Sequence, residues 1–244
     1  MIHMIARTAV GTFLTLTLTL ANRADDSAAV KGVKNLGGKV PVGGCIDFEK
    51  TKITDTDLKV LSEFSAVYML RLSETKISDA GLKYVRDLPK LKYLDLTGTR
   101  VTDAGMKELR FLENMEDLCF DRTSVTGTGF KEFKALKKLK NLRLSNSKVT
   151  DASLKLLKDL PNLDLLVIEG ARITDEGLKN LRGMKALGCI LMRDTLVTDT
   201  GMRVLQDKAS FPKLRAVDVA RTAVTDAGVE DLRKAYDYNF NVLR

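Results

Sequence analysis

The sequence predicts one α/β solenoid made of eight stacked repeats, and three observations predict it. A short element of the form V-T-D recurs eight times. Six of its seven intervals are 24 residues long, and the last is 27. Between copies, each repeat carries first the alternation of a strand and then the spacing of a helix. A motif that recurs at a nearly constant interval of 24 residues indicates a stack of repeats that share one supersecondary structure. The copies begin at Ile53, Ile77, Val101, Val125, Val149, Ile173, Val197 and Val224.

The strand is predicted from period-two alternation at the start of each repeat. In the repeat 91–114, Leu94 and Leu96 alternate with the more polar Asp95 and Thr97. One repeat is too small to bury its own apolar face, so neighbouring repeats must stack to form a core.

The helix is predicted from the second half of the repeat. Met106, Leu109 and Leu112 are spaced to lie on one helical face. Thr102 stands where a helix N-cap belongs, and its hydroxyl can accept a hydrogen bond from a free backbone N–H. Asp103 follows and places a negative charge at the positive end of the helix dipole.

A column of small hydroxyl residues marks the bend between strand and helix. A buried hydroxyl there can satisfy backbone groups of the adjacent coil, which is a structural role. The column consists of Thr51, Thr75, Thr99, Thr123, Ser147, Ala171, Thr195 and Thr222.

The beginning of the chain has the form of a secretory signal peptide. A basic start with Arg7 precedes the apolar and threonine-rich run 9–21, and small residues follow it. The run is shorter than the roughly 20 residues that a membrane span needs. The alternative is an uncleaved anchor or an amphipathic start.

Four segments follow from these patterns. Residues 1–24 are the predicted signal peptide, and 25–41 form a helical N-terminal cap. Residues 42–236 hold the eight repeats, and 237–244 form a C-terminal cap. Solenoid ends need such covers because an end repeat otherwise exposes its core.

The residue inventory argues against an enzyme. The single histidine, His3, lies in the predicted signal peptide, so the remaining chain lacks the base of a Ser-His-Asp or Cys-His pair. The three cysteines have no C-x-x-C spacing, and we expect no metal site and no cofactor. Cys45, Cys119 and Cys189 stand three repeats apart, about 14 Å at the spacing of neighbouring strands, so we expect no disulfide between them.

The repeat motif also resembles a known family. The pattern L-x-x-L-x-L followed by T-D-A-G-L is similar to bacterial leucine-rich-repeat proteins of the ribonuclease-inhibitor-like type, over residues 42–231. Threonine fills the bend position where asparagine or cysteine is usual in many such families. The resemblance implies a horseshoe with parallel strands on the concave face and short helices on the convex face, usually used for protein recognition. Residues 25–41 are too short for an F-box, so a ubiquitin-ligase role is not implied.

The exposed strand positions form three columns, which begin at Cys45, Asp47 and Glu49 and recur once in every repeat. Their residues vary freely, unlike those of the apolar core columns. One local feature is an apolar group on two neighbouring strands with a charged rim, which is typical of a partner site. A covering loop or a merely tolerated patch is the alternative. The apolar group is Leu165, Val167, Cys189 and Leu191, and the rim is Arg143, Glu169, Arg193 and Asp194.

A basic column runs along the predicted outer helices. It could bind nucleic acid or an acidic polymer. We favour helix pairing instead, because most of these residues follow an aspartate at i+4 and no aromatic residues interleave with them. The column is Lys59, Lys83, Lys107, Lys131, Lys155, Lys179 and Arg203.

Taken alone, the sequence therefore predicts an exported, periplasmic or extracellular, non-enzymatic recognition scaffold. It binds a protein or peptide partner through the concave face. The alternative is a binder of an acidic polymer or nucleic acid through the basic convex face.

Overall fold

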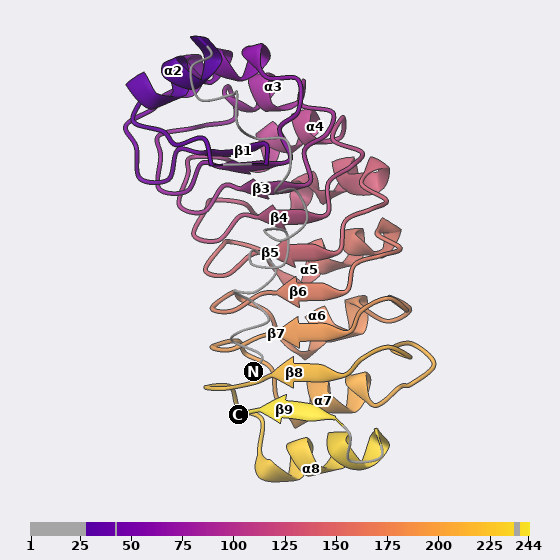
Figure 1. Cartoon of the computed structure of the whole chain (residues 1–244). Coiled ribbons are helices and arrows are strands. Elements are labelled where there is room, and N and C mark those ends of the chain that lie inside the picture. Colours follow the sequence, from indigo (N-terminus) through magenta and orange to yellow (C-terminus); the bar gives the residue numbers. More distant parts are fainter. Residues whose placement is uncertain (1–27, 42, 237–239) are drawn as a thin grey trace.

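A computed structural model describes residues 28–41, 43–236 and 240–244, and it confirms the predicted α/β solenoid (Figure 1). Nine parallel strands of three residues each form one sheet in sequence order, so every repeat adds one strand beside the last. The strands are β1 (Cys45–Asp47), β2 (Met69–Arg71), β3 (Tyr93–Asp95), β4 (Asp117–Cys119), β5 (Asn141–Arg143), β6 (Leu165–Val167), β7 (Cys189–Leu191), β8 (Ala216–Asp218) and β9 (Asn241–Leu243).

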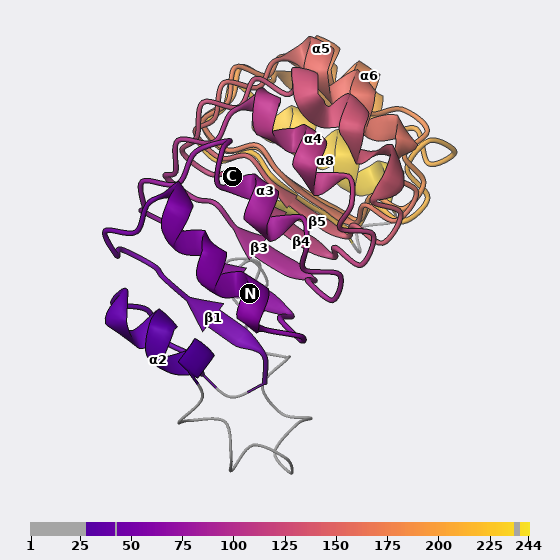
Figure 2. The ribbon, with the colours of Figure 1, turned by 90° about the horizontal axis from the view of Figure 1, so that it is seen from above.

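The helices form a second layer along one face of this sheet (Figure 2). Several repeats use a 3-10 helix, with i→i+3 bonds, where the sequence predicts an α-helix. The helical elements are α2 (Ala28–Asn35), η2 (Asp55–Glu63), α3 (Leu82–Val85), η3 (Asp103–Gly105), α4 (Met106–Leu109), η4 (Thr128–Ala135), α5 (Asp151–Leu154), η5 (Lys155–Asp159), α6 (Asp175–Asn180), α7 (Asp199–Leu205) and α8 (Asp226–Ala235).

The core lies between the two layers. The central residue of each strand from β1 to β8 points into it, and Leu94 and Leu142 are fully buried. In the middle of the solenoid, Phe133 stacks on Phe120 at 6.3 Å between ring centroids and contacts Phe130 at 5.4 Å. Apolar side chains of successive repeats thus form one continuous cluster.

The V-T-D element joins neighbouring repeats, a role that the sequence analysis did not predict. The Asp79 carboxylate accepts hydrogen bonds from the Thr102 backbone N–H at 2.8 Å and the Thr102 hydroxyl at 2.6 Å, one repeat further on. Asp55, Asp103, Asp151, Asp175 and Asp199 accept equivalent pairs of bonds. The threonine hydroxyl still accepts from a backbone N–H in some repeats, as expected of a cap, but it also donates across the repeat boundary.

This aspartate ladder explains the glycine in T-D-A-G-L. A Cβ atom at Gly177 would lie 2.5 Å from Asp151 Oδ1 of the preceding repeat. Gly127 replaces aspartate in the fourth repeat, and the next repeat carries Ser153 in place of the glycine. The ladder is interrupted there, and the Ser153 hydroxyl instead donates to the Thr150 carbonyl at 2.7 Å within its own repeat.

The hydroxyl column at the bend acts within its own turn. The Thr99 hydroxyl donates to the Leu96 carbonyl at 2.6 Å, and the six other hydroxyl residues of the column repeat this bond, whereas Ala171 has no hydroxyl. The sequence predicts that these hydroxyls bind backbone groups of the adjacent coil, and this prediction is wrong. The bend instead brings the backbone carbonyl of residue i−3, in the same repeat, within hydrogen-bond distance of each hydroxyl. The residue before each hydroxyl has a positive φ, so the column also marks a tight left-handed turn.

Both ends of the repeat array carry further elements. Val30 and Val33 of α2 are buried at the first repeat, and β9 pairs with β8 at the last. The predicted signal peptide, 1–24, lies outside the described residues. Among the residues that are described, no helix is both long enough and apolar enough to span a membrane.

Candidate partner-binding surface

The strand face opposite the helices is the candidate surface, and the strand register confirms its columns. Tyr93 pairs with Met69 on one side and Asp117 on the other, so these three residues are neighbours in the first column. Arg71 and Asp95 are neighbours in the second column. Their side chains face away from the core because adjacent strand residues point to opposite faces. The three cysteines lie on β1, β4 and β7 as free thiols.

The predicted apolar group is brought together, but it is not exposed. Leu165 and Val167 of β6 pair with Cys189 and Leu191 of β7, as expected. All four side chains are buried, with Leu191 only 2% exposed, so the prediction of an exposed patch is wrong. Strands about 4.8 Å apart bring such side chains into contact with one another. The cluster extends to Ala216 of β8, and Leu243 of β9 packs against it.

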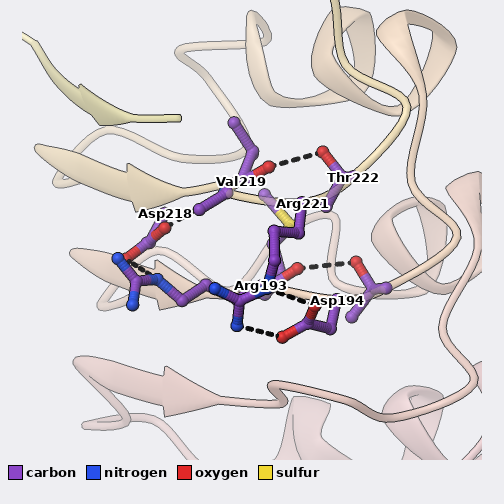
Figure 3. Close-up of polar contacts among 9 residues, drawn as sticks. Arg193, Asp194, Asp218, Val219, Arg221 and Thr222 are labelled. Carbon is purple, nitrogen blue, oxygen red and sulfur yellow. Dashed lines mark hydrogen bonds and ion pairs between the residues drawn. The ribbon is translucent and has the colours of Figure 1, made fainter.

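Arg193 and Asp194 of the predicted rim form ion pairs within the fold (Figure 3). The Arg193 guanidinium donates to Asp218 at 2.7 Å, and Asp218 is fully buried. The exposed Asp194 pairs with Arg221 of the next repeat through two hydrogen bonds. These contacts give Arg193 and Asp194 a structural role at the end of the sheet. The other two rim residues, Arg143 and Glu169, are half-buried.

The part of the face on β2 to β5 carries polar, charged and aromatic side chains, unlike the apolar cluster on β6 and β7. Met69, Arg71 and Tyr93 are half-buried there, beside the carboxylates of Asp95 and Asp117. Tyrosine, arginine and methionine are enriched at protein interfaces because they combine a large contact area with polar groups. The repeat period places these residues in the columns, but no local pattern in the sequence distinguishes them from the other column residues.

Burial raises the pKa of several side chains in this part of the face. It raises the pKa of the Tyr93 phenol, and the nearby Asp95 adds to that effect, so the phenol remains a hydrogen-bond donor. Burial also raises the pKa of Asp117 and Asp121, although hydrogen bonds from neighbours oppose it. The pKa of the buried Cys119 thiol lies well above its ordinary value, again mainly through burial. A thiol held protonated in this way is a poor nucleophile.

The charge of the face is opposite to that of the chain. The chain holds 40 basic and 32 acidic residues and carries a formal charge of +8. The three columns contain no lysine and more acids than bases. The acids are Asp47, Glu49, Asp95, Asp117, Asp121, Glu169 and Asp218, and the bases are Arg71, Arg143 and Arg193.

The basic outer column is not paired as the sequence predicts. Within the described part of the chain, no lysine of this column forms an ion pair with the aspartate four residues before it. Those aspartates bind the next repeat, which turns their carboxylates away from the helix surface. Lys179 pairs instead with Glu176, at i,i+3 and 2.5 Å. The interpretation of the column as i,i+4 helix pairing is therefore wrong.

Comparisons with known proteins agree with this architecture. A family model described as "Leucine Rich repeat" matches residues 87–109. No curated protein matches the chain.

Two solved structures from Listeria monocytogenes strain 4b F2365 share the fold. Internalin C2 is 21% identical with a TM-score of 0.61, and the match covers 83% of this chain and 87% of that protein. An internalin, InlF, is 17% identical with a TM-score of 0.55, over 76% of this chain and 56% of that protein. With its eight sequence repeats and its ladder of parallel strands, the chain has the fold of a leucine-rich-repeat solenoid.

Proposed function

We propose that this protein is an exported, non-enzymatic scaffold that binds a protein or peptide partner through its concave face. One observation carries the proposal. A basic solenoid, repetitive elsewhere, presents on this one face side chains that differ from repeat to repeat and include more acids than bases. A surface that must match one particular partner needs such local variety, and complementary charge favours the correct partner.

The contact is centred on β2 and β3, where Arg71 and Tyr93 are half-buried. Binding energy in protein interfaces is concentrated in a few such residues, above all tyrosine, tryptophan and arginine. From this centre the contact extends toward Arg143 and Glu169, beside the cluster of Leu165 and its neighbours.

The position of the contact is tested with a photo-crosslinking side chain. A benzophenone amino acid at position 93 should crosslink a discrete partner when the protein is irradiated in an extract of its native source. The same group in place of the exposed Lys107, on the outer helices, should give no such product. Electrophoresis and mass spectrometry of the crosslinked species give the result.

The same experiment tests the alternative, an acidic polymer bound by the convex lysines. Among the described residues, Lys179 alone of that column forms an ion pair, which favours this alternative more than the sequence did. Crosslinks to a polymer or nucleic acid from position 107, with none from position 93, would reject the concave face as the binding surface.

Export is the other part of the proposal. When the full chain is expressed in a bacterial host, we expect it to be recovered outside the cytoplasm with residue 25 at its N-terminus. Intact-mass measurement of each cell fraction detects this cleavage. A full-length chain confined to the cytoplasmic fraction would contradict export.

A further inference from the structure

A second line of positive charge runs along the edge of the solenoid where the strands turn toward the helices. We call it the edge stripe and define it as Lys52, Lys76, Arg100, Lys148 and Arg172. Each of these residues directly precedes the V-T-D element of its repeat, and all five side chains are exposed. Ser124 holds the same position in the fourth repeat and leaves one gap in the line.

The backbone holds the stripe in a regular array. The Arg100 N–H donates to the Ile77 carbonyl at 2.8 Å, and the Lys148 N–H donates to Val125 at 2.8 Å. A parallel bridge likewise joins Arg172 to the preceding repeat. Neighbouring strands stand about 4.8 Å apart, so the stripe extends over roughly 24 Å. Its charges are thus set at fixed intervals along the solenoid axis.

These five charges are not neutralised within the fold. In the described residues, none of them takes part in an ion pair. Three acids at the strand-to-helix bend pair with other bases: Glu74 with Arg122, Asp194 with Arg221, and Glu49 with Lys50. A row of exposed, uncompensated charges creates a positive potential that attracts a polyanion.

The shape of the stripe restricts the kind of polyanion. The stripe is one residue wide, so it matches a single extended chain of negative groups. No aromatic residue occupies the stripe position in any repeat, so the stacking surface that single-stranded nucleic acids use is absent from it. We propose that the edge stripe binds an extended acidic polysaccharide through its carboxylate or sulfate groups. This site is separate from the concave face and does not depend on the function proposed above.

The test compares two variants with the same change in net charge. The stripe variant carries Lys76→Gln, Arg100→Gln and Lys148→Gln, and the control carries Lys59→Gln, Lys107→Gln and Lys155→Gln on the outer helices. Binding to a heparin oligosaccharide is measured by calorimetry at several salt concentrations. Circular dichroism checks that both variants remain folded, which is expected because all six side chains are exposed.

We expect the stripe variant to lose about tenfold or more in affinity at low salt, and the control to change by less than about threefold. The slope of log affinity against log salt should fall by about 2 in the stripe variant, because each contact that forms releases about 0.7 of a counterion and the variant lacks three such contacts. Equal losses in both variants would show that net charge alone drives binding. Absence of binding by the unmodified protein, or tighter binding of single-stranded or duplex DNA of equal charge, would equally overturn the proposal.

Discussion

Replacing Leu142 by alanine should lower the free energy of unfolding by about 2–5 kcal/mol. Leu142 has no exposed surface, and the register places it between Leu118 of β4 and Leu166 of β6. The shortened side chain leaves a cavity at the centre of the stack, and the neighbouring leucines cannot fill it without moving their strands. Chemical denaturation followed by circular dichroism measures the loss.

Asn141→Ala provides the control for that change. Asn141 precedes Leu142 on the same strand but lies on the opposite face and is half-buried. We expect its replacement to cost about 1 kcal/mol or less. Similar losses for the two variants would contradict the assignment of Leu142 to the core.

Gly177→Ser should also destabilise the protein, by about 1–3 kcal/mol, because the site is already filled. A Cβ atom at this position would lie 2.5 Å from Asp151 Oδ1 and 2.7 Å from a methyl carbon of Ile173. The serine therefore forces the Asp151 carboxylate away from Thr174, whose N–H and hydroxyl it binds at 2.8 and 2.6 Å.

A double-mutant cycle tests the physical reason. Asp151→Gly with Gly177→Ser reproduces, one repeat later, the natural combination of Gly127 and Ser153. We expect the double variant to be more stable than the sum of the two single changes predicts, by about 1 kcal/mol or more. Additive effects would show that the aspartate ladder does not determine where glycine is required.

The sequence alone was sufficient for most of the fold. Its 24-residue period located every strand from β1 to β7, because stacked units of equal length must repeat their core positions in phase, and the repeated motif located β8 after the 27-residue interval. The same period identified the columns of the concave face and placed Leu165 beside Cys189. These are consequences of strand periodicity and repeat length, which are local properties of the chain.

Contacts between repeats were not predictable in this way. Asp79 stands at i−4 to Lys83, which favours a pair within the helix, yet its carboxylate binds Thr102 in the next repeat. Leu191 occupies a position facing away from the core, yet it is buried among its neighbours on adjacent strands. Periodicity determines which face a side chain takes, but only the packing of residues 24 or more positions apart decides which atoms it meets and whether water reaches it.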